Sequence, residues 1–207
     1  MIIKKYRIVL GILGWGALFF SFLLSALHVP GINVNNPFGP WNKFSFYTVQ
    51  TNIFISLWFI LSLRKESGVF VSYPWKTAFA VYIAVTGIIF GVFLSSYLNG
   101  LPWYIWILSL IMHYILPAGF ILDWALFPSK ESLKVRHIFL FLIYPCCYGA
   151  YTVIFGILTE WYPYPMIDIK TLGGMAGGRN YLFFLGFFLL LNCIFFGISK
   201  LKRGKPG

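Results

Sequence analysis

Apolar residues are concentrated in six windows along the chain, and short polar segments separate these windows. They cover residues 8–29, 44–63, 77–98, 103–126, 137–158 and 181–199. An α-helix rises 1.5 Å per residue, so about 20 residues cross the ~30 Å hydrocarbon core of a bilayer. The pattern therefore predicts an all-α integral membrane protein, with six transmembrane helices in a single bundle and one domain over residues 1–207.

The composition supports this class of protein. Hydrophobic residues make up 59% of the chain, charged residues make up 10%, and the mean hydropathy is +0.81. A soluble domain carries about 25% charged residues, so this chain lacks the polar surface that a water-soluble fold requires. The first window has no small-residue cleavage site before His28 and Pro30, which indicates a retained helix rather than a signal peptide.

The basic residues predict the orientation of the helices. All but three of the 16 Lys and Arg residues fall on one side of the predicted membrane, and the exceptions are Lys43, Lys170 and Arg179. Because positive charge marks cytoplasmic loops, we expect a multi-pass protein of the cell membrane with both termini in the cytoplasm. The net charge of +11 is then explained by the orientation of the helices in the membrane and by contact with anionic lipid head groups. The basic residues are spread over four short segments, so no nucleic-acid partner is expected.

A histidine, His113, lies in the middle of the fourth window. An ionisable side chain at membrane depth normally faces the interior of the bundle, a water-filled cavity or a partner. Burial disfavours its charged form and leaves a neutral imidazole that can accept a proton. Asp123 lies ten residues further on, about 15 Å away along the helix. We therefore expect Asp123 to pair with Lys130 or Arg136 at the inner interface rather than with the imidazole.

The second window opens with the densest polar cluster of the chain, which contains Thr48, Gln50, Thr51 and Asn52. Residues three and four apart share a helix face, so Thr48, Thr51 and Asn52 point together. Such groups serve either as a site or as hydrogen-bonding contacts between helices, and the sequence leaves both open. The second and fourth windows both run inward from the outside. We therefore expect Thr48 within hydrogen-bond or one-water distance of His113, in a cavity open toward the outer leaflet.

Two outer segments connect the windows. Residues 28–41 are rich in Pro, Gly and Asn, which predicts a turn-forming, non-helical loop. Residues 159–180 combine aromatic residues and prolines with a glycine-rich end, and they form either an ordinary interfacial cap or a lid over a cavity. Trp161, Tyr164 and Pro165 are the substrate-binding or lid candidates. The glycines match no nucleotide-binding motif, and we expect no cofactor.

Three short motifs carry a resemblance to a known family. They are FYTVQTN in the second window, MHYILP in the fourth and WYPYP before the sixth. Together with the order of the windows, they resemble the androgen-induced and androgen-dependent multi-pass membrane proteins. That resemblance implies a hydrolase of fatty acid esters of hydroxy fatty acids. The family's threonine nucleophile falls on Thr48, its histidine on His113, and its late Tyr-Pro pair on Tyr164-Pro165.

The chain also departs from that family. In that family the motif around the threonine continues with an Asp-Leu-type pair, and this chain has Thr51-Asn52 there. The polar groups beside the expected nucleophile therefore differ. The compact length and the abundance of Ile, Phe and Lys resemble a bacterial member.

The chemistry that the resemblance implies has a consistent physical basis. A threonine hydroxyl is a weak nucleophile until a base within hydrogen-bond reach takes its proton, and histidine is the usual base. An oxyanion donor is also required. Asn52, Gln50, Thr51 and Asn192 are the candidates for oxyanion binding or for polarising the site, and the sequence does not choose among them. The expected partners are membrane lipids or a lipid-like ester.

Two other function classes remain open. A transporter or channel would use His113, Asp123 and Asn192 as a polar relay through the membrane. A non-catalytic lipid-binding protein would use His113 as a buried structural residue that hydrogen-bonds between helices. A metal site is not expected, because His28, His113 and His137 are predicted at three different depths.

Overall fold

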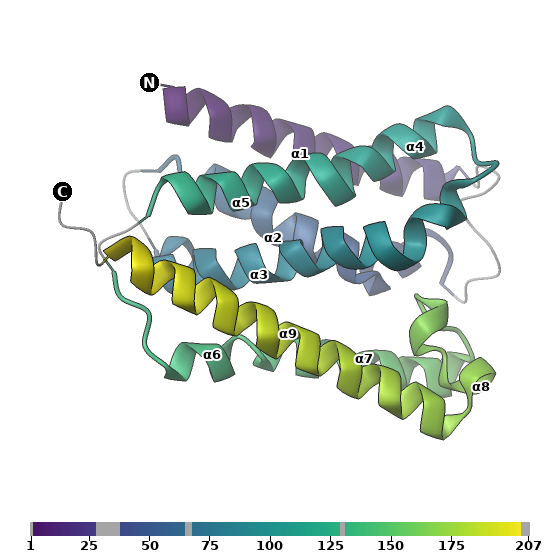
Figure 1. The fold of residues 1–207 in the computed structure, drawn as a ribbon. Coiled ribbons are helices and arrows are strands. Elements are labelled where there is room, and N and C mark those ends of the chain that lie inside the picture. The colour runs from purple at the N-terminus through teal and green to yellow at the C-terminus, as the bar shows by residue number, and fades with distance from the viewer. Residues whose placement is uncertain (1, 28–37, 65–67, 129–130, 204–207) are drawn as a thin grey trace. The chain divides into compact units, whose positions relative to one another are not determined.

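The computed structural model describes residues 2–27, 38–64, 68–128 and 131–203, and every regular element in these ranges is a helix (Figure 1). Within these ranges, five helices are long and apolar enough to cross a membrane, and a bent pair adds a sixth if it counts as one span. The prediction of an all-α, multi-pass membrane protein is confirmed at that level. The described residues divide into two compact units. The first unit contains the described residues up to Glu131, with the exception of Phe38. The second unit contains Phe38 and the described residues from Ser132 on.

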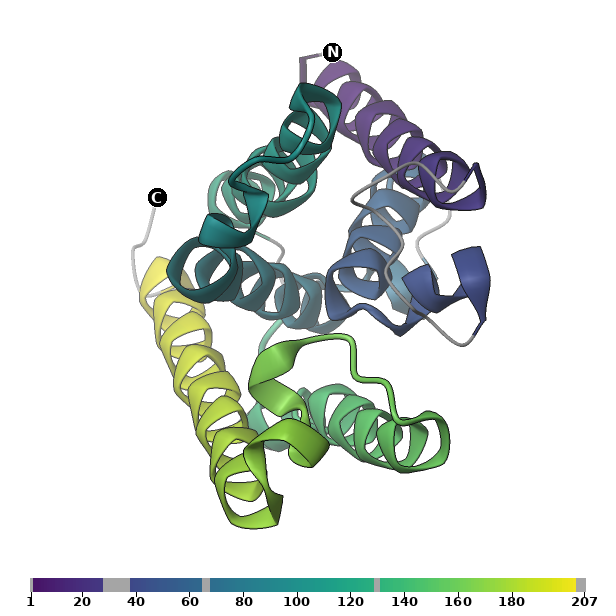
Figure 2. The same cartoon turned by 90° about the vertical axis from the view of Figure 1, so that its right-hand side faces the viewer.

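The first unit is built from helices that pack in chain order, and Figure 2 shows them closer to end-on. α1 packs on α2, α2 on α3, and α3 on α5. The α-helices of this unit are α1 (Ile2–Ala26), α2 (Tyr47–Leu61), α3 (Tyr73–Ile89), α4 (Trp103–Leu110) and α5 (Leu116–Leu126). Its 3-10 segments are η1 (Gly39–Ser45), η2 (Val69–Val71) and η4 (Ser95–Leu98), and its π-helical segments are η3 (Phe90–Leu94) and η5 (Ile111–Ile115).

The second predicted span differs from the expectation of one helix over residues 44–63. The chain forms η1 and then α2, and the two axes differ by 72°. The break falls at Phe46, whose backbone is extended with φ −79° and ψ 128°. The fourth predicted span agrees with the helical run Trp103–Leu126, which is continuous through η5. Of the predicted loop over residues 28–41, positions 28–37 lie outside the described residues.

A close approach of backbones joins α1 to α2. A Cβ atom added to Gly14 would overlap the hydroxyl of Ser56, and one added to Gly11 would lie 3.5 Å from the Cβ of Phe59. Both glycines are buried. Small residues at such a contact let two membrane helices approach closely and gain dispersion energy along their length.

A buried ion cluster joins α1, α3 and α5. Asp123 is fully buried and accepts two bonds from Arg7, from Nε at 2.8 Å and from Nη2 at 3.0 Å. Lys76 Nζ lies 2.6 Å from the Asp123 carboxylate and also donates to the carbonyls of Asp123 and Phe127, at 3.0 Å each. The prediction that Asp123 pairs with Lys130 or Arg136 is wrong, because helix packing brings cations from α1 and α3 to it. Lys130 itself lies outside the described residues.

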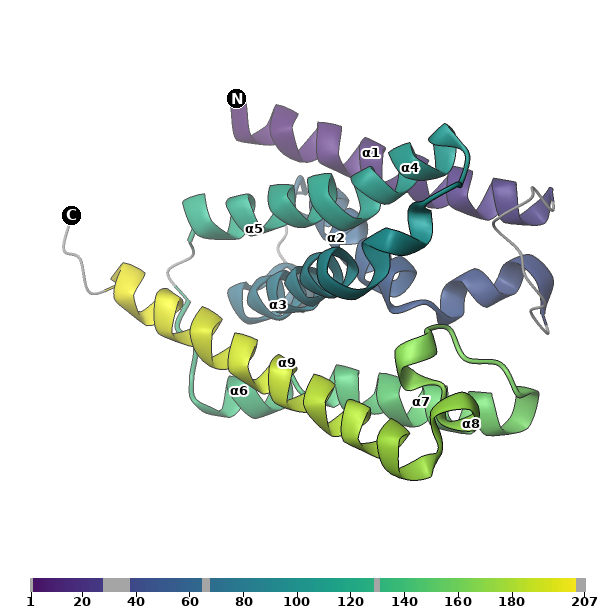
Figure 3. The ribbon, with the colours of Figure 1, turned by 45° about the vertical axis from the view of Figure 1, so that its right-hand side comes forward.

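The second unit contains α6 (Arg136–Leu140), α7 (Ile143–Thr159), η6 (Pro165–Ile167), α8 (Ile169–Leu172) and α9 (Gly174–Arg203). Its two longest helical runs correspond to the predicted fifth and sixth spans. The glycine-rich end that was expected in a loop is helical, because α9 already begins at Gly174. Figure 3 shows α8 beside the start of α9. Asn180 of α9 donates from Nδ2 to the carbonyl of Met166 in η6 at 2.7 Å.

Two glycines of α1 test the packing contact with α2. Gly14→Ala should destabilise the protein by about 1–3 kcal/mol, because the new methyl group displaces Ser56 and separates the helices. Gly16→Ala is the matched control, since nothing lies within 4 Å of a Cβ at that position. It should leave the protein equally or slightly more stable. Thermal unfolding in detergent measures both, and equal stability of the two variants would contradict the contact.

Asp123 and Glu160 form ion pairs in very different surroundings. Asp123→Asn should cost about 3–5 kcal/mol, because it leaves the buried Lys76 and the partly buried Arg7 without their carboxylate. Glu160 is exposed, and the hydrogen bond and charge of Lys170 hold the pKa of its carboxyl below the ordinary value. Glu160→Gln should cause no measurable loss, because water screens that pair. Thermal unfolding measures both variants. If Asp123→Asn left the stability unchanged, that result would argue against the buried cluster.

Candidate functional site

Thr48 lies in the first turn of α2, directly after the bend. The extended backbone of Phe46 ends η1, and α2 begins at Tyr47, so Thr48 is its second residue. Thr48 is 9% exposed. The aligned peptide dipoles give a helix N-terminus a partial positive charge, which stabilises negative charge placed near it. The bend therefore puts a buried hydroxyl at the positive end of a helix.

The hydroxyl of Thr48 faces the imidazole of His113. Thr48 Oγ1 lies 3.3 Å from His113 Nε2, so the expected proximity of these two side chains is confirmed. The other ring nitrogen, Nδ1, lies 2.9 Å from the carbonyl oxygen of Ser109. Because a carbonyl only accepts, Nδ1 carries the proton and donates it to Ser109. A neutral ring then has a free electron pair on Nε2, and Thr48 donates to it.

The helix around His113 is wound as the π-helical segment η5. At its end, the N–H of Leu116 donates to the carbonyl of Ile111, five residues back, instead of to that of Met112. A π-helical pattern would give Met112 the N–H of residue 117, but Pro117 has none. Asn52 supplies the missing donor, because its Nδ2 lies 3.1 Å from the Met112 carbonyl. The segment that carries His113 is thus held by a side chain from α2, the helix that carries Thr48.

α3 packs against the same segment through a glycine and an aromatic ring. A Cβ on Gly87 would lie only 2.9 Å from the carbonyl oxygen of His113, so a side chain here would push the two helices apart. Three residues further on, directly after α3 and at the start of η3, the ring of Phe90 stacks on the imidazole with centroids 3.7 Å apart and planes 17° apart. The imidazole is therefore fixed by Ser109 at one edge and by Phe90 on one face.

The other polar residues of the second span join helices. Asn52 Nδ2 also donates to the Thr48 carbonyl at 2.8 Å, so both amide hydrogens are used, while its Oδ1 has no partner among the described residues. Thr51 Oγ1 lies 2.9 Å from Thr86 Oγ1 on α3. Gln50 Nε2 donates to the carbonyl of Phe44 in η1 at 2.8 Å. Their roles as oxyanion candidates stay a prediction.

The remaining candidates belong to the second unit. Asn192 on α9 is 2% exposed, and neither of its amide atoms has a partner among the described residues. The ring of Trp161 packs edge-to-face on Phe155, with centroids 6.0 Å apart. Tyr164 leads into η6, which begins at Pro165. The use of this segment as a lid stays a prediction.

Some residues of the site carry no clear signal in the sequence. Ser109, Gly87 and Phe90 look like ordinary members of apolar helices. One signal is present, because Pro117 four residues after His113 marks a break in the hydrogen-bond ladder at the histidine. In the ranges that the structure describes, no group of three His, Cys, Asp or Glu residues could hold a metal ion.

Comparison with known proteins gives no match: no family model, no curated protein and no solved structure matches this chain.

The hydrogen bond from Asn52 to the π-helical segment η5 can be tested by measuring the stability of variants. Asn52→Ala should cost about 1–3 kcal/mol, because it leaves the buried Met112 carbonyl without a donor. Gln50→Ala is the matched control, since its bond to Phe44 is exposed and water can replace it. Thermal unfolding of both variants in detergent checks the difference. If Asn52→Ala were as stable as Gln50→Ala, the segment would not depend on this bond.

Proposed function

We propose that this protein is an intramembrane lipid ester hydrolase that uses Thr48 as nucleophile and His113 as base. The single observation that carries the proposal is the chain of contacts from Thr48 Oγ1 to His113 Nε2 at 3.3 Å and from His113 Nδ1 to the Ser109 carbonyl at 2.9 Å. A nucleophile that faces a base, with the base oriented by a third group, is the arrangement that covalent catalysis requires. The first distance is slightly longer than the ~2.6–3.2 Å of an active pair, as is common before substrate binds.

The reaction would proceed through an acyl-enzyme. Thr48 Oγ attacks the ester carbonyl carbon while His113 Nε2 takes the hydroxyl proton. The tetrahedral oxyanion then collapses, the carbon–oxygen bond to the leaving group breaks, and His113 returns its proton to the leaving alkoxide. Water, deprotonated by the same nitrogen, then attacks the acyl carbon. The bond from that carbon to Thr48 Oγ breaks, and His113 returns the proton to Oγ, which releases the fatty acid and restores the threonine.

Two charges that develop during this reaction lie beside groups that stabilise them. The oxyanion would form near the positive end of α2, because Thr48 is in its first turn. The imidazolium would keep its bond to the Ser109 carbonyl and would lie against the face of Phe90, where the ring quadrupole attracts a cation. Asp123 does not take part, since its carboxylate is bound by Arg7 and Lys76.

The proposed substrate is an amphiphilic ester within the membrane, such as a fatty acid ester of a hydroxy fatty acid. Its carbonyl would reach Thr48 from the outer leaflet, with its acyl chains among apolar helices. The resemblance to the androgen-induced family supports this substrate class. The proposal includes six spans, with η1 and α2 counted as one, and both termini in the cytoplasm of the cell that carries the protein.

The function can be tested by labelling purified protein with a fluorophosphonate probe, which reacts with an activated hydroxyl. Thr48→Ala and His113→Ala should each reduce the labelling rate at least about 100-fold, because they remove the nucleophile or its base. Thr48→Ser keeps a hydroxyl and should retain labelling. Ser95→Ala is the matched control, since it removes a hydroxyl that bonds only its own helix at Gly91.

The outcomes separate the candidate functions. Labelling that survives in Thr48→Ala would show that another residue is the nucleophile. If well-folded wild-type protein is not labelled and cleaves no ester of this class, the hydrolase proposal is wrong. His113 would then be a structural or relay residue of a lipid-binding or transport protein.

A further inference from the structure

The ion cluster around Asp123 carries more positive than negative charge. Arg7 and Lys76 share this one carboxylate, so the three groups together have a net charge of +1. The side chains of Asp123 and Lys76 are 0% and 5% exposed, respectively. Another acid, Glu131, accepts the N–H of Tyr73 at the start of α3 but is itself exposed. An excess charge in such a place is costly unless an anion or water reaches it.

The donors of the two cations are used unequally. Lys76 has three N–H groups, and its acceptors include the Asp123 carboxylate and the carbonyls of Asp123 and Phe127. Arg7 has five N–H groups and uses only Nε and one hydrogen of Nη2. Its Nη1 and the second hydrogen of Nη2 have no partner among the described residues. The Arg7 side chain is 16% exposed, which makes it the accessible part of the cluster.

A tryptophan supports both cations from within the unit. The ring of Trp58 on α2 lies 4.8 Å from the guanidinium carbon of Arg7 and 5.0 Å from Lys76 Nζ. Trp58 is 2% exposed, and its Nε1 has no hydrogen-bond partner among the described residues. These contacts fix the guanidinium plane, so its unused N–H groups are held in place before any ligand binds. A preorganised fork loses little entropy when it binds a planar or tetrahedral oxyanion.

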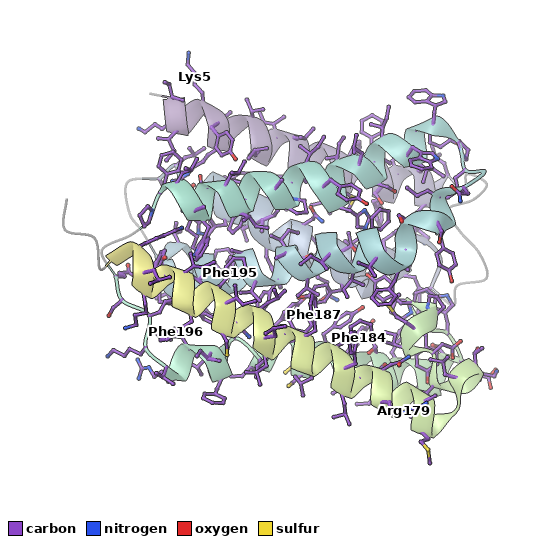
Figure 4. All side chains as sticks on the ribbon, in the orientation of Figure 1. Lys5, Arg179, Phe184, Phe187, Phe195 and Phe196 are labelled. Atoms are coloured by element: carbon purple, nitrogen blue, oxygen red, sulfur yellow. The ribbon has the colours of Figure 1, made fainter. Side chains whose placement is uncertain are left out.

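We propose that Arg7 binds the phosphate group of an anionic membrane lipid. Arg7 lies five residues after the start of α1, about 8 Å along the helix axis. Lys4 and Lys5 precede it, and both are exposed; Figure 4 shows Lys5 directed away from the helices. This position matches the level of lipid head groups beside a membrane helix. The guanidinium binds phosphate oxygens through two parallel bonds, and the net charge of the cluster favours an anionic over a zwitterionic lipid. The site does not depend on the proposed hydrolase activity.

Phosphatidylglycerol binding to the purified full chain in nonionic detergent, followed by native mass spectrometry, tests this site with two variants. Arg7→Lys keeps the charge and a bond to Asp123 but loses the fork, and it should weaken binding about tenfold or more. Lys5→Gln removes a charge from the same helical turn but leaves the cluster intact, so it should weaken binding no more than about fivefold. If general surface charge alone holds the lipid, the order is reversed, and that result would overturn the proposal.

Wild-type protein supplies a second test that does not depend on the folding of Arg7→Lys. Phosphatidylglycerol should raise the unfolding temperature more than phosphatidylcholine, oleate or inorganic phosphate at equal concentration. Equal stabilisation by oleate would show that any amphiphilic anion is sufficient. Equal stabilisation by inorganic phosphate would assign the site to a free anion rather than to a lipid. Either result would contradict a lipid phosphate site.

Discussion

Pro117 has no amide hydrogen, and much of the first unit is arranged around that missing donor. The helix passes through the π-helical segment η5 before the proline, and the carbonyl of Met112 takes its hydrogen bond from Asn52 instead. In a low-dielectric interior an unsatisfied carbonyl is costly, so this exchange fixes the contact between α2 and the fourth span. Gly87 leaves room for the displaced His113 carbonyl, and the imidazole turns toward Thr48. The contact between Thr48 and His113 therefore follows from the way in which the backbone carbonyls near Pro117 obtain their hydrogen bonds.

Two groups of polar side chains lie along the same helical run of the first unit. At one, η5 holds His113 against Thr48; ten residues later, α5 holds Asp123 between Arg7 and Lys76. The first group joins two helical runs and the second joins three, and both exclude alternative registers, because a shift of one residue would bury an unpaired charge or amide. Apolar side chains alone would tolerate a shift of one helix along another. These polar contacts specify which faces of the helices meet.

The sequence predicts the helices well because span length and hydropathy are local properties. It also predicts the meeting of Thr48 and His113, because the second and fourth predicted spans run in the same direction, and side-chain length and helix tilt can close the gap between their predicted depths. It fails for Asp123, because depth along one helix does not say which helices stand beside it, and Arg7 and Lys76 come from distant segments. The bend at Phe46 is likewise hidden, because the apolar window over residues 44–63 runs across it. Gly87 is recognisable as a contact point only when its neighbour, the His113 carbonyl, is known.

The bend between η1 and α2 has a consequence for the lipid around the protein. α2 has 15 residues and is about 22 Å long, so it is shorter than the ~30 Å hydrocarbon core. η1 turns away by 72°, and its Trp41 and Phe44 are 66% and 45% exposed, as suits aromatic side chains lying along an interface. A short span next to longer ones is a hydrophobic mismatch, which a bilayer accommodates by thinning locally. A bilayer that thins beside α2 would bring water and lipid head-group atoms closer to the first turn of α2, where Thr48 lies.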